Sequence, residues 1–123
     1  MPIQPEDIHQ LFAEGVNAGD VDALVTLFET DATVIEQTGE RTEGCDRIRT
    51  HLEHLVALRP VMRIEASVAH RQGDLALLSS RWTASATTPD GKPVEMEFHG
   101  SEIARLQSDG NWRLMLDNPW GAG

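Results

Sequence analysis

A carboxylate on an apolar strand face is the first feature of this sequence that could do chemistry. The segment after Pro93 alternates apolar and polar residues, and Glu102 falls on its apolar face. The other members of that face are Val94, Met96, Phe98, Gly100, Ala104 and Leu106. An ionised carboxylate in apolar surroundings is costly, so such a group is paired, shifts its pKa or has a function. A β-bulge at Gly100 would instead turn Glu102 towards water.

Two further acidic residues extend this pattern. Glu36 shares a predicted strand face with Ala32 and Val34, and Asp117 lies on the last predicted strand. The pattern leaves the direction of Asp117, inward or outward, open. If Asp117 points inward, we expect it to interact with Glu102 and to raise the pKa of one member of the pair.

The histidines point less clearly to chemistry. His51 and His54 are three residues apart on a predicted helix, a spacing that can hold a metal ion. However, Leu52 and Leu55 already define the buried stripe of that helix, so we place both histidines at its solvated edge. The remaining histidines, His9, His70 and His99, form no recognisable ligand spacing with them. We therefore expect no metal and no cofactor.

Three helices are predicted in the first half of the chain. The first runs from the turn at 5–7 to 17–19 and carries Ile8, Leu11, Phe12, Gly15 and Val16 on one face. The second is short, begins after the N-cap Asp20 and carries Leu24, Leu27 and Phe28 on its apolar side. Residues 32–37 are then strand-like. The third helix runs from about 45 to 58 and ends before Pro60, because proline cannot continue a helix.

The second half changes to a period of two. Met62, Ile64, Ala66 and Val68 alternate with more polar residues, and turn signals at 72–74, 89–91 and 108–111 separate apolar runs. Four antiparallel strands are therefore predicted, in which Trp82 forms either a flat cavity wall or plain core. Helices grouped before an antiparallel sheet indicate an α+β fold.

Composition excludes several classes of function. The 123 residues fit a single domain spanning 1–123, and 40% of them are apolar, which suffices for a globular core. A net charge of −10 argues against binding nucleic acid or an anionic membrane surface. One cysteine, Cys45, allows no intramolecular disulfide and is typical of a reducing compartment. Without a recognisable signal segment or membrane span, the expected location is the cytoplasm.

Several short motifs together resemble a known family. They are Asn17-Ala18-Gly19-Asp20, Leu27-Phe28, Asp31-Ala32-Thr33-Val34, Glu43-Gly44, Ile48-Arg49, Asp109-Gly110-Asn111-Trp112-Arg113 and Asp117-Asn118-Pro119-Trp120-Gly121. The chain is similar over almost its whole length to the ketosteroid isomerase and SnoaL-like (polyketide cyclase-like) families of the nuclear-transport-factor-2-like superfamily. The resemblance implies a cone-like bent antiparallel sheet, wrapped by three N-terminal helices around an apolar pocket. It is specific for the fold and much less so for the reaction.

The resemblance also implies site residues. Ketosteroid isomerases use an aspartate base with a tyrosine and a protonated aspartic acid as oxyanion donors. The base position falls here on Glu36 and the acid position on Glu102, whereas the tyrosine position falls on Phe12 and supporting hydroxyls fall on Phe28 and Leu52. Losing one oxyanion donor costs a factor of about 10²–10³ in rate. Efficient steroid isomerisation is therefore not expected.

Two functions remain open. The first is an acid–base enzyme of isomerase, cyclase or lyase type acting on a small apolar carbonyl compound, with Glu36, Glu102 and Asp117 as catalytic groups. The ligand-binding wall would be formed by Phe12, Val16, Phe28, Leu52, Leu55, Leu78, Trp82, Phe98 and Trp120. The alternative is a non-catalytic ligand-binding or dimerisation domain, which the complete absence of tyrosine favours. A homodimer is expected by resemblance, through an outer sheet face carrying Leu75, Leu77 and Ile103.

Overall fold

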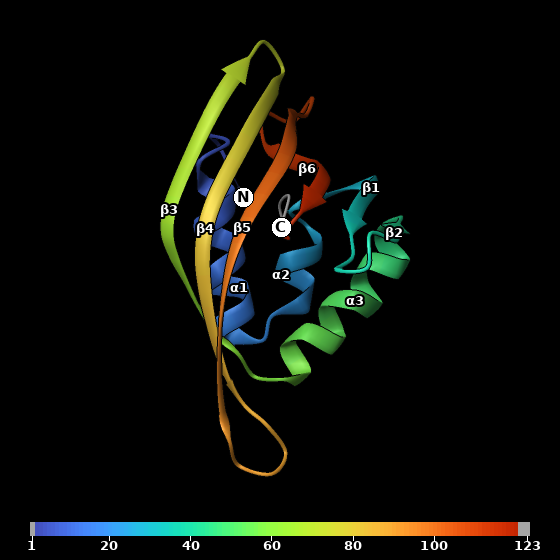
Figure 1. Cartoon of the computed structure of the whole chain (residues 1–123). Helices are drawn as coiled ribbons and strands as arrows, with labels where there is room; N and C mark the ends of the chain where they lie inside the picture. Colours follow the sequence, from blue (N-terminus) through green and yellow to red (C-terminus); the bar gives the residue numbers. More distant parts are fainter. Residues whose placement is uncertain (1, 121–123) are drawn as a thin grey trace.

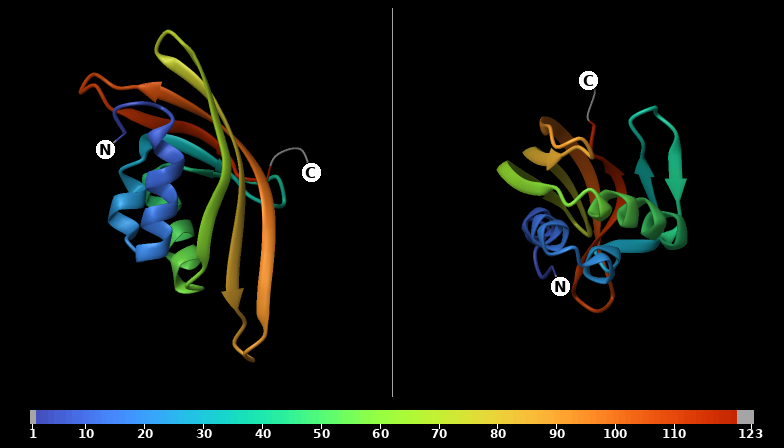
Figure 2. Two further views of the ribbon diagram at one scale, coloured as in Figure 1. Left: turned by 90° about the vertical axis from the view of Figure 1, so that its left-hand side faces the viewer. Right: turned by 90° about the horizontal axis from the view of Figure 1, so that it is seen from below.

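A computed structural model describes residues 2–120 and consists of three helices and one six-stranded sheet (Figure 1). In chain order the elements are α1 (Asp7–Ala18), α2 (Val21–Val25), β1 (Phe28–Ile35), β2 (Arg41–Glu43), α3 (Cys45–Ala57), β3 (Val61–Gln72), β4 (Leu75–Thr87), β5 (Pro93–Leu106) and β6 (Trp112–Asn118). The helices lie on one side of a strongly curved sheet (Figure 2). The α+β fold with a bent sheet is therefore confirmed.

The sheet has the strand order β2-β1-β6-β5-β4-β3. The strands β3 to β6 form the predicted antiparallel meander, and β2 pairs antiparallel with β1. One pair differs from the expected antiparallel arrangement, because β1 runs parallel to β6. The sheet is therefore mixed, and this one parallel pair joins the N-terminal half of the chain to its last strand.

Helix α1 ends where the sequence predicts. Gly19 takes a left-handed conformation with φ 66°, which glycine adopts without steric cost, and its N–H donates to the carbonyls of Gly15 and Val16. Asp20 then caps α2, since its side chain accepts a hydrogen bond from the Ala23 N–H. The last helix, α3, ends within one residue of the predicted boundary.

The second helix is shorter than predicted. Leu27 and Phe28 do not belong to it, because α2 stops at Val25 and Phe28 already begins β1. The Thr26 hydroxyl donates back to the Ala23 carbonyl at 2.6 Å, which satisfies the helix end. Phe28 then pairs with Leu114 of β6, so sheet pairing takes over from helical spacing at this point.

A bulge in β3 changes the side of the sheet that its residues face. The pairing with β4 shifts between Ile64 and Ala66, so that Ser67 rather than Ala66 lies on the helix side. The prediction that Ala66 and Val68 share a face with Met62 and Ile64 is therefore wrong. Val68 is exposed on the outer face, whereas Met62 is buried.

One apolar core lies between the helices and the concave face of the sheet. Its fully buried members include Ile8, Leu24, Ile48, Leu52, Leu78, Trp112 and Leu114. These come from all three helices and from β4 and β6, so the core ties the N-terminal half to the meander. Within residues 2–120, the helices are too short or too polar to cross a membrane.

Candidate functional site

Two buried carboxyl groups face each other on neighbouring strands. Glu102 of β5 pairs in register with Asp117 of β6, and their side chains are only 5% and 8% exposed. The strand parity that placed Glu102 on the apolar face is therefore correct, and the bulge that would have turned it to water does not occur at Gly100. The open question about Asp117 is also resolved, because Asp117 points inward.

A histidine from the first turn of α1 completes this group. The His9 ring is buried, and its Nε2 forms a short hydrogen bond with Oε1 of Glu102. Its Nδ1 lies 2.6 Å from the hydroxyl oxygen of Ser67, which the bulge in β3 turns towards α1. Because a carboxylate can only accept, the Nε2–H of His9 donates the hydrogen bond to Glu102, and Nδ1 accepts one from the Ser67 hydroxyl.

Asp117 holds its proton more tightly than an ordinary aspartic acid does. Burial, followed by the nearby charge of Glu102, raises the pKa of Asp117 well above the ordinary value of 3.8. Two like charges on neighbouring strand positions in an apolar site cannot both form at low cost. Asp117 therefore keeps its proton to a higher pH than a free aspartic acid does, because its pKa is raised, while Glu102 has the histidine partner.

Gly100 makes room for the Glu102 carboxylate. A Cβ atom at this position would lie 2.8 Å from Oε2 of Glu102 and 3.1 Å from the hydroxyl oxygen of Ser80. Such a separation is shorter than carbon and oxygen atoms tolerate, so a larger residue would displace the carboxylate. The glycine acts here by allowing close approach, and not as the bulge residue that the sequence also permitted.

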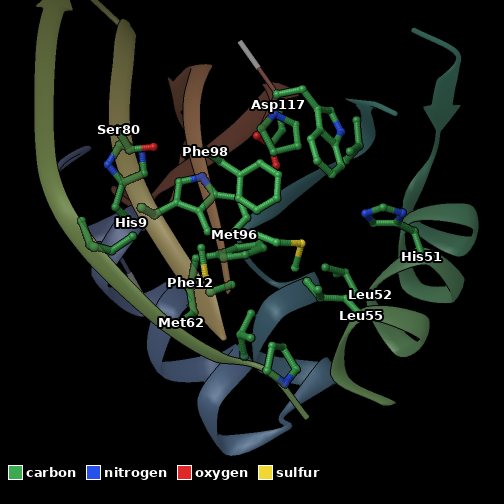
Figure 3. Close-up of a pocket in the computed structure, with 18 of the residues that line it drawn as sticks. His9, Phe12, His51, Leu52, Leu55, Met62, Ser80, Met96, Phe98 and Asp117 are labelled. Carbon is green, nitrogen blue, oxygen red and sulfur yellow. The ribbon is translucent and has the colours of Figure 1, made fainter. Parts of the chain in front are cut away.

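These polar groups lie in the wall of a cavity of about 380 Å³. Figure 3 shows His9, Ser80 and Asp117 around one end, with Met62 and Leu55 at the other. Nine of the predicted site residues line it: Phe12, Val16, Leu52, Leu55, Trp82, Phe98, Glu102, Asp117 and Trp120. Most of the remaining lining is apolar, as is usual for sites that bind small molecules.

Three predicted site residues lie elsewhere. Phe28 and Leu78 are buried core residues that do not line the cavity. Phe28 lies behind Phe12, whose ring packs edge-on against it at 6.4 Å, and Leu78 belongs to the core cluster. Glu36 also lies outside the lining, where it accepts a hydrogen bond from Thr42 at 2.6 Å and pairs with His51 at 3.1 Å.

Three aromatic rings form a continuous wall beside the carboxyl pair. Trp82 and Phe98, which pair in register on β4 and β5, stack with their centroids 4.3 Å apart. Trp120 meets Phe98 edge-on at 4.8 Å. Offset stacks and edge-on contacts are the favourable arrangements of such rings, so the three rings support one another as an apolar wall.

The predicted edge histidines also contribute to the cavity. His51 and His54 of α3 both line it, and His51 is half-buried whereas His54 is exposed. His51 lies across the cavity from His9 (Figure 3). Within residues 2–120, no group of three or more His, Cys, Asp or Glu side chains is arranged to hold a metal ion.

His9 is the candidate site residue that the sequence reasoning missed. Phe12, Ala13 and Val16 follow His9 by three, four and seven residues. This is the spacing of one helical face, so His9 lies on the same stripe as these apolar residues. A histidine on an apolar stripe carries the same signal as a glutamate on an apolar strand face. Ser67 gave no such signal, because the bulge that turns it inward leaves no mark in the sequence.

Solved structures with the same fold come from several bacteria. A nuclear-transport-factor-2-like superfamily protein from Salmonella enterica aligns with a TM-score of 0.82 at 16% identity, covering 96% of this chain and 90% of that chain. A protein from Shewanella frigidimarina, provisionally named a ketosteroid isomerase, aligns with a TM-score of 0.79 at 15% identity, covering 91% and 90%. A provisionally named dehydratase of the same superfamily from Streptomyces avermitilis gives 0.79 at 16%, covering 94% and 93%. At these identities the likeness shows the fold alone.

Sequence comparison identifies the family directly. None of the proteins with curated function matches the chain significantly. The SnoaL-like domain family, in contrast, matches residues 8–115. This range contains the three helices except the first residue of α1, and it contains the sheet except the end of β6 after Met115. Glu102 therefore lies inside the matched range and Asp117 lies just beyond it. The chain therefore belongs to the SnoaL-like domain family.

Proposed function

We propose that this chain is an acid–base enzyme of isomerase, cyclase or lyase type, acting on a small apolar carbonyl compound bound in the cavity. The observation that carries the proposal is the buried pair of facing carboxyls, Glu102 and Asp117, with His9 against one of them. Pairs of titratable groups whose surroundings separate their ionisation mark acid and base assignments. The provisionally named isomerase and dehydratase with this fold are consistent with such chemistry.

The roles follow from the two environments. Glu102 is the base that removes a proton from the carbon next to the carbonyl, using Oε2 because Oε1 contacts His9. Asp117 is the acid that donates a hydrogen bond to the developing oxyanion. An isomerase would return the proton from Glu102 to a second carbon, so that no proton is gained or lost overall. This assignment differs from the one implied by resemblance, in which Glu36 is the base and Glu102 the acid.

The apolar wall supports the same chemistry. Trp82, Phe98 and Trp120 flank the carboxyls, and a bound ligand would exclude most water from this end of the cavity. Electrostatic interactions strengthen when water is excluded, so one donor and one base act more strongly there than in solution. Phe12 still offers no hydroxyl, which supports a reaction other than efficient ketosteroid isomerisation.

A minimal carbonyl probe tests the proposal. Cyclohex-3-enone rearranges to the conjugated cyclohex-2-enone by moving one proton, and the conjugated product is followed by its absorbance. We expect Glu102→Gln and Asp117→Asn each to lower kcat/KM by a factor of about 10²–10³. Glu36→Gln, the matched control outside the cavity lining, should change it less than about tenfold. Full turnover in Glu102→Gln or Asp117→Asn would refute the proposal.

A second candidate is a domain that binds a small ligand without converting it. The observation in its favour is that the chain contains no tyrosine, so it lacks the phenolic donor of related isomerases. A thermal-shift screen with phenols, enones and amines separates the two candidates. Stabilisation by phenols or enones that is lost in Glu102→Gln supports acid–base chemistry, whereas stabilisation by amines alone supports binding.

We further propose that two copies of the chain pair through the outer sheet face. Leu75 and Leu77 are 44% and 51% exposed there, and Leu77 pairs in register with Ile103. Adjacent exposed apolar residues are typical of interaction surfaces. Sedimentation should give a dimer at micromolar concentration and a monomer for Leu77→Lys. A monomeric wild-type protein would contradict this proposal.

A further inference from the structure

The cavity is elongated along β4 and β5, and its two ends differ in chemistry. On β5 the inward residues Glu102 and Met96 both line it, and six residues of extended strand separate them by about 20 Å. On β4 the inward residues Ser80 and Ala86 line it over the same span. One end therefore carries Ser80, Glu102, Asp117 and His9, and the other end carries no acidic residue among those that line it.

The middle of this trough is aromatic. Trp82 and Phe98 occupy the inward positions between the two ends and stack on each other. The apolar lining that they form continues from the carboxyl pair towards Ala84 and Met96, which also pair in register. A ligand lying along the strands would keep contact with apolar surface over its whole length.

The far end opens to solvent through an apolar rim. Leu58, the C-cap of α3, is 61% exposed, and Met96 is 38% exposed, yet both line the cavity. The buried Pro60 and the half-buried Ala86 lie beside them, and the exposed His54 is the polar member of this end. Large apolar side chains left in water at a cavity mouth gain free energy when a ligand covers them.

We propose that the natural ligand is an elongated amphipathic carbonyl compound, whose carbonyl head lies at Glu102 and Asp117 and whose apolar tail covers Leu58 and Met96 at the rim. This inference rests on the proposed function for the placement of the head, and it adds the length and chemistry of the tail. A ligand that ended at Trp82 and Phe98 would leave the rim residues in water. The rim also lets tails of different lengths protrude, so the site selects for apolar length rather than for one fixed shape.

A series of straight-chain methyl ketones tests the tail site directly. Tryptophan-fluorescence titration would compare 2-hexanone with 2-heptadecanone, because only the longer chain is long enough to reach the rim from the carboxyl pair. Each added methylene should tighten binding by up to roughly fourfold, so 2-heptadecanone should bind at least about a hundredfold more tightly. Leu58→Asp and Met96→Asp should each weaken 2-heptadecanone binding by about tenfold and leave 2-hexanone binding within about twofold.

The controls separate the tail site from other effects. Ile3→Asp places the same charge at a large apolar residue that is 74% exposed and lies outside the cavity lining, and it should leave the affinity for both ketones unchanged. Leu58→Ser tests the rim with a milder change if either aspartate variant unfolds. Equal affinity for the two ketones, or equal weakening of both by the rim variants, would overturn the inference. Turnover of cyclohex-3-enone, which is too short to reach the rim, tests the proposed function separately.

Discussion

Two histidine–glutamate pairs each place their histidine in the wall of the cavity, and the surroundings of the two pairs are very different. In the pair of His9 and Glu102, the side chains are 8% and 5% exposed. In the pair of His51 and Glu36, they are 30% and 28% exposed. The two pairs have the same chemical composition, so any difference between them arises from burial and from neighbouring groups.

The neighbours decide what each pair can do. Glu102 faces a second buried carboxyl, Asp117, and its other oxygen lies beside the space left by Gly100. Glu36 instead accepts a hydrogen bond from Thr42 at the edge of the sheet and lies outside the cavity lining. The buried pair therefore resembles an acid–base site. The outer pair resembles a surface ion pair, which links α3 to the residue that follows β1.

The largest expected contrast between the pairs is in stability. His9→Phe leaves the Glu102 carboxylate buried without its partner, and it should lower the free energy of unfolding by about 3–5 kcal/mol. His51→Phe should lower it by no more than about 1 kcal/mol, because Glu36 keeps Thr42 and partial contact with water. Urea unfolding followed by tryptophan fluorescence measures both values.

A double variant distinguishes the cost of an unpaired charge from lost packing. His9→Phe combined with Glu102→Leu removes both polar groups and should recover most of the stability lost in His9→Phe. If the double variant is as unstable as the single one, packing around the ring accounts for the loss. Equal effects of His9→Phe and His51→Phe would remove the contrast between the two pairs altogether.

The second contrast concerns pH and arises from Asp117, which has no counterpart beside Glu36. Because its pKa is raised in the folded state, the folded protein binds this proton more tightly than the unfolded chain does. The contribution of Asp117 to stability is therefore fully present below the unfolded pKa of about 3.9 and is lost as pH rises through the folded pKa. Asp117→Asn should raise stability relative to wild type by about 1–3 kcal/mol at pH 8.

The way in which this stability difference changes with pH shows whether the folded state favours a protonated Asp117. The stability difference between Asp117→Asn and wild type should be small near pH 4 and should grow towards pH 8, as measured by urea unfolding across that range. Glu36→Gln is the matched control and should show no comparable growth. A difference that shrinks with rising pH would mean that the folded state favours an ionised Asp117.

Of the buried pair, the sequence predicted the acidic member, Glu102, but not its histidine partner, His9. Glu102 was found because strict alternation over a long strand fixes the face of each residue, and no bulge interrupts β5 before Glu102. His9 was missed because the apolar face of its helix was described by Ile8, Leu11, Phe12, Gly15 and Val16, and His9 was considered only as a metal ligand. His51 was placed at a solvated edge, and the structure shows it half-buried at the cavity, since α3 leans over the open side of the sheet.

The parts of the fold that sequence could not predict are those set by pairing between distant strands. The bulge in β3 depends on its register with β4, and it decides that Ser67 reaches His9. The early start of β1 at Phe28 depends on its partner Leu114, which lies 86 residues later in the chain (114 − 28). Turns, by contrast, are local, and the turns predicted at 72–74, 89–91 and 108–111 connect successive strands in the structure.

The smallest expected contrast concerns salt. Glu36→Gln should lower the free energy of unfolding by less than about 1 kcal/mol, because the His51–Glu36 pair is partly exposed and mobile ions screen it. Raising the ionic strength from 0.05 to about 1 M should remove most of that difference, since the Debye length falls to about 3 Å. The effect of His9→Phe should survive the same change, because ions cannot enter the buried pair. Equal salt sensitivity of the two variants would show that the inner pair is open to solvent, and it would weaken the case for Glu102 as a shielded base.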